Sequence, residues 1–420
     1  ANVLRDGGNA FDAAVAGLLV LNVTYGEAAS FPSIAPLLVW DAAAGKARSY
    51  LGVGTAPARA TIEEFRARGH QVVPKYDILA QLVPASPDVI VELLLSHGTK
   101  RFAELAAPAV AIAEEGFPVH LAMARDLDFD FFERLGFRIL LPYNAEVFTQ
   151  GEWWRPVVAG DRFRMPDLAE TLRTLGEVES ACIRDGGTRE DCLLEVRDYF
   201  YRGPIAAAIV ALHEEHDGLM TREDLEGYAG RWESPLRGRF RGYDVLTNGT
   251  WTQGIVVPMA LQILDGLPLA EMGHDSAEYV HTVVQALELA MGDREAWAGD
   301  PDYVDVPTAR LLDLEYAATQ RQRMTENAFG ALPASGIPTP SSASTDGERP
   351  LQRQSAPPRR AQPYGRDTSY LAVIDPAGNS VSMTPSDFPQ SPMVPGMGLT
   401  LGIRMTQFCL DPESPTAVSY

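Results

Sequence analysis

The first apolar stretch of the chain follows a helix-start signal. Asn9 can accept hydrogen bonds from the free N–H groups of a first helical turn, and Asp12, three positions later, completes a capping box. The residues from Ala13 to Val23 are small and apolar on nearly all sides. Because a surface helix keeps a polar face, this pattern predicts a buried helix.

Other periodicities predict a mixture of helices and strands. Residues 35–53, "APLLVWDAAAGKARSYLGV", read as two strands about a Gly-containing turn, and "RGRFRGYDVLTNG" alternates like a strand. Helical patterns dominate residues 61–140 and 167–228. Asp275 with Glu278 predicts a second capping box, before the helical pattern "YVHTVVQALELAMGDREAW". Four apolar residues are expected on one face of that helix: Val283, Leu287, Ala290 and Met291.

The composition changes abruptly before residue 368. Residues 334–367 are rich in Pro, Ser and Arg and contain almost no large apolar side chains, so they are predicted to be a mobile linker. Directly after them, "TSYLAVID" alternates, "PAGN" reads as a turn and "SVSMT" returns, which predicts a β-hairpin.

Length and charge narrow the class of protein. The chain has 420 residues, which suggests one large or two fused domains. A formal net charge of −21 repels phosphate backbones and anionic membranes, so nucleic acid is not an expected partner. No apolar run reaches the roughly 18 residues of a membrane span. The opening residues read like the inside of a folded unit, so a preceding segment is expected.

Cysteine and histidine residues leave alternatives open. Cys182 and Cys192 flank a Gly-Gly turn and could pair, whereas Cys409 stands alone, and this usage indicates no compartment. His213 and His216, in "HEEHDG", could bind a metal from one helix face, but a solvated acidic face is the favoured interpretation. No metal site and no cofactor are predicted.

The junction between linker and hairpin has two interpretations. If the bond between Asp367 and Thr368 were cut, Thr368 would gain an α-amine with a pKa of about 8, able to act as general base for its own hydroxyl. The hydroxyl could first attack the carbonyl of Asp367, giving an ester that water opens. The alternative is an ordinary strand residue that follows a loop.

Eight stretches together resemble the γ-glutamyltranspeptidase family of N-terminal-nucleophile hydrolases. They follow the family order from end to end: "GGNAFDAAVA", "APARATIEEF", "GLMTREDLEGY", "RGRFRGYDVL", "TQGIVVPMALQIL", "GDREAWAGDPDYVDVP", "DTSYLAVIDPAGNSVSMT" and "VPGMGLTLGIRMTQFCLDPESP". The resemblance implies an α+β fold, a four-layer αββα sandwich with the nucleophile at the start of a central strand. It also implies self-cleavage into a large and a small subunit that stay associated.

Carried over by position, the resemblance assigns a large-subunit segment 1–335, a linker 336–367 and the start of the small subunit at 368–420. Thr368 matches the nucleophile, and Ser386 matches a hydroxyl residue that hydrogen-bonds it. The alternative for Ser386 is a plain loop serine after a proline.

The residues that would bind substrate depart from the family pattern. Val53 stands where members specific for γ-glutamyl groups hold the substrate carboxylate with an Arg, and Phe388 and Gln407 stand where an Asn and an Asp hold its amine. A desolvated zwitterion needs paired charges, and Arg404, nearby, could still take a carboxylate.

Three functions are therefore compared. The resemblance favours a self-processing hydrolase or acyltransferase acting on a small-molecule amide or γ-glutamyl-type substrate. The alternatives are an acylase for a non-glutamyl amide, such as a β-lactam side chain, and a non-catalytic scaffold. The family's small subunit continues past the position of Tyr420 and carries the oxyanion-hole glycines there, so either the sequence is a fragment or the site is incomplete.

Overall fold

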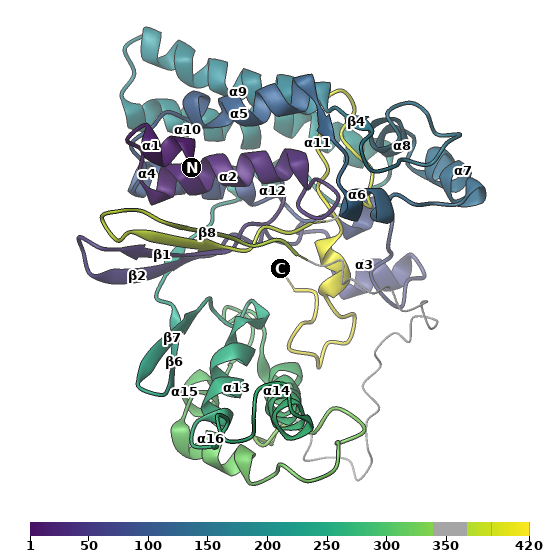
Figure 1. Ribbon diagram of the computed structural model, residues 1–420. Helices are drawn as coiled ribbons and strands as arrows, with labels where there is room; N and C mark the ends of the chain where they lie inside the picture. The colour runs from purple at the N-terminus through teal and green to yellow at the C-terminus, as the bar shows by residue number, and fades with distance from the viewer. Residues whose placement is uncertain (339–367, 388, 420) are drawn as a thin grey trace. The chain divides into compact units, whose positions relative to one another are not determined.

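The computed structural model describes residues 1–338, 368–387 and 389–419, and the chain forms two compact units (Figure 1). The first unit combines residues 1–233 with 367–410 and 418–420, and the second consists of 234–366 and 411–417. Most of the predicted linker, from residue 339 to Asp367, lies outside the described residues. The first unit thus joins the N-terminal segment to the hairpin that follows the linker.

An antiparallel five-stranded sheet forms the first unit's centre, in the order β5-β2-β1-β9-β8. Its strands are β1 (Leu37–Asp41), β2 (Lys46–Tyr50), β5 (Trp232–Glu233), β8 (Leu371–Ile374) and β9 (Ser380–Met383). Both predicted hairpins, β1–β2 and β8–β9, are confirmed. β9 pairs with β1, with Leu37 opposite Met383 and Trp40 opposite Ser380. The backbone ladder therefore ties the segment after residue 367 to the N-terminal segment.

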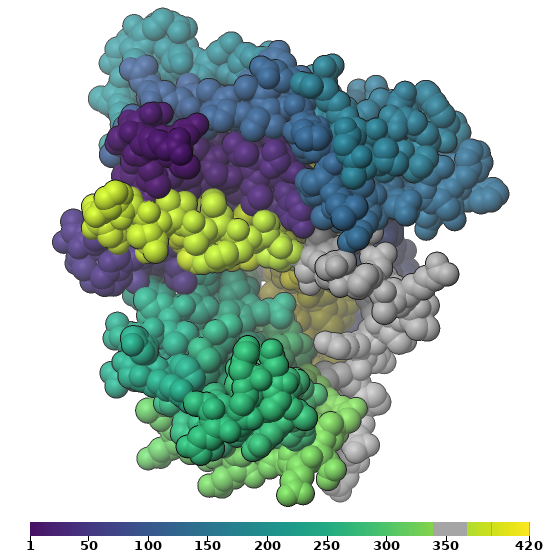
Figure 2. Space-filling model, in the orientation of Figure 1, coloured from purple at the N-terminus to yellow at the C-terminus, as the bar shows by residue number. Residues whose placement is uncertain are grey.

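Helices cover one face of this sheet. Helix α2 (Ala10–Thr24) packs on β8 and β9, and Figure 2 shows the surface of the hairpin directly against that of the N-terminal helices. The predicted capping box at Asn9 and the burial of α2 are confirmed. Asp375, in the hairpin turn, accepts a hydrogen bond from the N–H of Ala10 at 3.0 Å. Its carboxylate thus fixes the hairpin to the positive end of the helix.

The other helices of this unit pack mainly on one another, and α5 packs on both α2 and α9. They are α1 (Asn2–Arg5), α3 (Ile62–Ala67), α4 (Ser86–Ser96), α5 (Phe102–Glu115), α6 (Leu121–Asp126), α7 (Phe131–Leu140), α8 (Pro142–Phe148), α9 (Pro166–Arg184), α10 (Arg189–Tyr201), α11 (Pro204–Glu215) and α12 (Arg222–Gly227), with the short strands β3 (Phe117–Pro118) and β4 (Arg162–Phe163) and the 3₁₀ turns η1 (Ile78–Ala80) and η4 (Arg404–Gln407). Helices packed on an antiparallel sheet confirm the α+β class. Among the described strands β8 lies at the sheet edge, paired only with β9, which differs from the central position that the resemblance implied.

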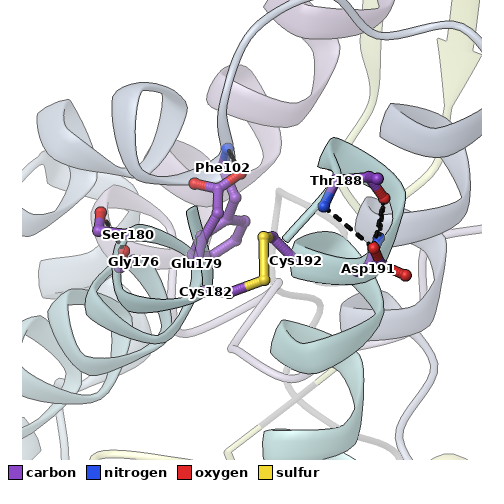
Figure 3. The surroundings of a disulfide bond; sticks show 8 residues. All are labelled: Phe102, Gly176, Glu179, Ser180, Cys182, Thr188, Asp191 and Cys192. Carbon is purple, nitrogen blue, oxygen red and sulfur yellow. Dashed lines mark hydrogen bonds between the residues drawn. A yellow bond between two sulfur atoms is a disulfide. The ribbon is translucent and has the colours of Figure 1, made fainter. Parts of the chain in front are cut away.

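A disulfide joins the two cysteines that flank the Gly-Gly turn (Figure 3). Cys182, near the end of α9, and Cys192, in the first turns of α10, have Cα atoms 5.3 Å apart. Gly187 lies against the bond, because a Cβ there would come within 2.5 Å of the Cys182 sulfur. The pairing that the sequence left open is thus present, and it fixes the corner between the two helices.

The second unit contains a hairpin and a small helical cluster. Its elements are β6 (Leu236–Phe240), β7 (Tyr243–Thr247), η2 (Gln253–Ile255), α13 (Val256–Leu264), α14 (Ala277–Trp297), α15 (Thr308–Leu311) and α16 (Leu314–Arg321). The single strand predicted at "RGRFRGYDVLTNG" is wrong. Arg241 and Gly242 both have positive φ, 49° and 85°, and form a two-residue turn between two strands.

The start and the buried face of α14 also differ from prediction. Ser276, not Asp275, is the N-cap, and its Oγ accepts a hydrogen bond from Tyr279 N at 3.1 Å. Asp275 has a φ of 59°, whereas an N-cap residue has extended backbone. Leu287 is exposed. The buried face consists of Thr282, Gln285, Ala286, Leu289, Ala290, Gly292 and Asp293.

Within the described part of the chain, no helix is long and apolar enough to cross a membrane.

Candidate active site

The hydroxyl groups of Thr368 and Ser386 lie together in the first unit, with their oxygens 3.3 Å apart. The hairpin brings them into contact, because the backbone N–H of Ser369 donates to Pro385 O at 3.0 Å. Ser386 is buried at 2% exposure. A reciprocal backbone pair fixes it to Ile34, with N···O distances of 3.1 and 3.2 Å. Thus both hydroxyls are positioned by backbone pairing before any substrate binds.

Asp387 is a buried residue of this site that the sequence analysis did not single out. Its backbone N–H donates to Ala28 O at 3.0 Å, and its Oδ1 accepts from Ile403 N at 3.0 Å. The carboxylate lies against Gly402, where an added Cβ would come within 1.8 Å of it. Gly402 also has a φ of 77°, so only glycine fits this approach without strain. The adjacent acid and hydroxyl in "PSDF" were the available signal.

The four predicted substrate-binding residues are placed differently from one another. Arg404 is buried at the start of η4, directly after the Ile403 amide that Asp387 holds. Gln407 is exposed at the other end of η4, and Val53 is half-buried beyond the end of β2. Phe388 and the cleavage-site residue Asp367 lie outside the described residues. Arg404 is therefore linked to the hydroxyl pair, because it follows Ile403, which Asp387 binds, and Asp387 follows Ser386. Gln407 and Val53 are not linked to the hydroxyl pair through Asp387.

The two histidines of "HEEHDG" have different environments. His216 is exposed as expected, but the solvated face predicted for His213 is wrong, since His213 is only 2% exposed. Position 213 continues the apolar face of α11 that Ile205 and Ile209 begin, and helical spacing turns it into the core. Burial, followed by the charge of His216, lowers the pKa of His213 to about 3. Among the described residues no group of three or more His, Cys, Asp or Glu side chains could hold a metal ion.

Glu27 is a second buried acid beside the site. It precedes Ala28, which accepts the backbone hydrogen bond of Asp387. Neither of its side-chain oxygens has a hydrogen-bond partner among the described residues. His120 Nε2 lies 3.3 Å from Oε1, but Thr24 O, at 3.1 Å, is the nearer acceptor for the ring proton, which is on Nε2 because Nδ1 accepts from Met123 N. Burial is the main cause that raises the pKa of Glu27 to about 8.

Glu27→Gln should stabilise the protein above about pH 5. The folded protein keeps the Glu27 proton up to about pH 8, whereas the unfolded chain loses it near its ordinary pKa of 4.5, so parent stability falls across that window. The slope is at most about 1.4 kcal/mol per pH unit from this group. Urea unfolding at pH 5, 6.5 and 8 measures it, with the exposed Glu63→Gln as control. If the free energies of unfolding of the parent and of Glu27→Gln changed in parallel with pH, the raised pKa of Glu27 would be contradicted.

Known proteins are similar to this chain in sequence along nearly its whole length. The family model of gamma-glutamyltranspeptidase matches residues 1–419. The glutathione hydrolase-like YwrD proenzyme of Bacillus subtilis is 29% identical over 413 residues, covering 97% of this chain and 69% of its own. The chain spans about two thirds of the length of the curated relatives it matches.

Solved structures agree with this. A cephalosporin acylase from Bacillus halodurans superimposes with a TM-score of 0.81 at 28% identity, covering 100% of this chain and 69% of the acylase. The γ-glutamyltranspeptidase of Helicobacter pylori gives a TM-score of 0.68 at 25% identity, covering 83% of this chain and 94% of the other. The matched relatives are hydrolase and acylase enzymes, several of them named as proenzymes. The chain described here belongs to the gamma-glutamyltranspeptidase family.

Proposed function

We propose that this protein is a self-processing amide hydrolase or acyltransferase whose nucleophile is Thr368. The observation that carries the proposal is the contact of the Thr368 and Ser386 hydroxyls, 3.3 Å apart, at the open end of the β8–β9 hairpin. Family membership supports the reaction class. The residues 336–367 then form the linker between a large segment, 1–335, and a small segment that begins at 368.

In the self-cleavage step, Thr368 Oγ1 attacks the carbonyl carbon of Asp367. The Asp367–Thr368 C–N bond breaks, the Thr368 nitrogen takes a proton to become the α-amine, and an ester joins Asp367 to Oγ1. Water then opens the ester, giving an Asp367 carboxylate and a free Thr368 hydroxyl. The α-amine now lies on the nucleophile's own residue, where it can remove the hydroxyl proton.

In turnover, the same oxygen attacks the carbonyl carbon of an amide substrate. The amide C–N bond breaks, the leaving amine takes the proton held by the α-amine, and the acyl group remains on Oγ1 as an ester. Water releases it as a carboxylic acid, or an amine acceptor takes it in a transfer. Ser386, with a hydroxyl that can donate and accept, orients Oγ1 in both reactions.

The fragments stay together after cleavage because pairing across the cut is extensive. β9 pairs with β1 over four residues on each strand, and Asn144 Nδ2 donates to Pro389 O and Ser391 O at 3.0 and 2.8 Å. These hydrogen bonds join the segments before and after the linker. Their separation would expose a strand edge and a buried amide, which is costly.

The finer fold assignment is a four-layer αββα sandwich. Helix α2 covers one face of the sheet. The opposite face presents Trp40, which is 41% exposed, and Ile374, which is 72% exposed. Exposed large apolar side chains on this face, on either side of Ser380, fit packing against a second sheet.

Two experiments test the function. Purified protein is incubated with a panel of amide substrates, and intact-mass analysis follows the fragment that contains Thr368. We expect turnover, together with an acylated small fragment when an electrophilic substrate analogue is used. A protein that remains one chain and turns over none of the panel would favour the scaffold alternative.

An acyl group other than γ-glutamyl is the favoured substrate. Val53 and Gln407 replace charged positions that hold the zwitterionic head group in γ-glutamyl-specific members, and an absent charge-assisted hydrogen bond costs roughly 1.5–3 kcal/mol. The similarity to a cephalosporin acylase agrees with an acyl group other than γ-glutamyl. Arg404, buried beside the site, suits a single carboxylate.

Glutathione and γ-glutamyl anilides should therefore be poor substrates. We expect kcat/KM at least about a hundredfold below that of the best non-glutamyl acyl anilide, since two charge-assisted contacts are lost. Val53→Arg should raise γ-glutamyl turnover, and Val53→Met serves as the matched control of similar length. A parent protein that prefers γ-glutamyl anilides over every other acyl group would refute this specificity.

A further inference from the structure

A buried chain of neutral hydrogen bonds connects helix α11 with the loops beside the candidate site. Gln81, only 1% exposed, lies at its middle. Its Nε2 donates to Ser391 Oγ at 2.9 Å and to Pro392 O at 2.9 Å. The Ser391 hydroxyl in turn donates to Gly402 O at 2.7 Å. One side chain from the N-terminal segment thus holds two loops of the segment after the linker.

His213 fixes the orientation of the Gln81 amide. Its Nδ1 accepts from Met220 N at 3.3 Å, so the ring proton is on Nε2, which lies 3.1 Å from Gln81 Oε1. A reversed amide would set its N–H groups against this proton. Because its pKa is about 3, the ring is neutral at any working pH and keeps one acceptor and one donor. Gly218 leaves just enough room, since a Cβ there would come within 2.2 Å of Nδ1.

The chain ends at the residues that surround the hydroxyl pair. Gly402 lies against the Asp387 carboxylate, which also holds the amide of Ile403, and Arg404 follows directly. Asp387 is the neighbour of Ser386. A shift of the 402–404 backbone would therefore move Arg404 relative to the Thr368 hydroxyl. Misplacement of a binding group by about 1 Å can reduce turnover by up to about a hundredfold.

We propose that His213 and Gln81 are positioning residues, which hold loops 389–393 and 402–404 in the arrangement that orients an incoming substrate on Thr368. His213 and Gln81 do not themselves touch the reacting atoms. These two residues act through Ser391 and Gly402. The orientation of substrate by these residues rests on the proposed function. Their effect on the order of the two loops does not depend on it.

The first test separates substrate turnover from self-cleavage. Gln81→Leu and Ser391→Ala each interrupt the series of hydrogen bonds from His213 to Gly402. Ser391→Ala removes only one oxygen, so it leaves the packing almost intact. With the best amide substrate, kcat/KM should fall about tenfold, mainly through KM, because each variant removes buried hydrogen bonds that hold loops 389–393 and 402–404. The self-cleavage half-life should stay within about twofold, since Asp367 is delivered by the chain itself. His216→Phe, at the C-cap of the same helix, is the control for His213→Phe and should leave both rates unchanged.

A second measurement does not depend on activity. Hydrogen exchange of amides 389–403 should become about tenfold faster in Gln81→Leu, while β8 and β9 keep their protection. In this exchange measurement the double variant His213→Phe/Gln81→Leu should equal Gln81→Leu, because His213 acts on loops 389–393 and 402–404 through Gln81. Unchanged exchange at 389–403, or an equal slowing of self-cleavage and turnover, would overturn the positioning role. If the parent protein showed neither self-cleavage nor turnover, the proposed function would be refuted. The hydrogen-exchange result would still decide whether His213 and Gln81 hold loops 389–393 and 402–404.

Discussion

Thr368→Ala is expected to remain a single chain on a denaturing gel, while the parent protein separates into two fragments. Alanine keeps the backbone of the hairpin start but removes Oγ1, the atom that attacks Asp367 in the proposed step. Without a nucleophile the ester cannot form, so self-cleavage should slow by at least about a thousandfold. Turnover should fall equally, because the variant has neither a hydroxyl nor a freed α-amine.

Two controls distinguish this outcome from misfolding. Thr368→Ser keeps the hydroxyl and should still mature, and Ser369→Ala alters the next residue without removing the nucleophile. Both variants and Thr368→Ala should share the parent's thermal unfolding transition. If Thr368→Ala matured at the parent rate, another residue would have to carry the chemistry.

Ser386→Ala should give the second-largest loss. Its hydroxyl lies 3.3 Å from Thr368 Oγ1, and the backbone pair with Ile34 holds it there. Alanine fits the same backbone, so the fold should persist, but Oγ1 loses the contact that orients it. We expect self-cleavage and turnover both to slow by about a hundredfold, since the two reactions use one oxygen.

The matched variants sharpen this result. Ser386→Thr keeps a hydroxyl and should be mild. Ser382→Ala removes a serine hydroxyl from the same hairpin, where it contacts Tyr370, and should have no effect. Cleavage half-lives and turnover are measured for all three. Parent rates in Ser386→Ala would reduce the candidate site to Thr368 alone.

Local sequence signals predicted much of the first unit. The cap at Asn9, the buried helix behind it and both hairpins follow from short-range patterns that the structure preserves. The pattern could not show that β9 pairs with β1, because that contact joins residues more than 300 positions apart and depends on the whole fold. The family resemblance, rather than periodicity, indicated that these segments belong together.

The errors in predicted secondary structure and burial arose where the conformation or surroundings of a single residue decided the outcome. Arg241 adopts a positive φ, which alternation alone does not reveal, and so a hairpin was read as one strand. His213 was judged by its acidic neighbours, but helical spacing places it in the core. Asp387 was missed because its importance depends on Gly402, a partner that only the folded chain brings to it.

The central claim concerns a single peptide bond, and the sequence of the small fragment's first residues tests it most directly. Full-length protein is purified, its fragments are separated under denaturing conditions, and the smaller one is subjected to N-terminal sequencing. We predict that it begins Thr368-Ser369-Tyr370. A fragment that begins at any other residue, or a chain that stays whole under conditions in which it is folded, would contradict the assignment of Thr368 as the N-terminal nucleophile.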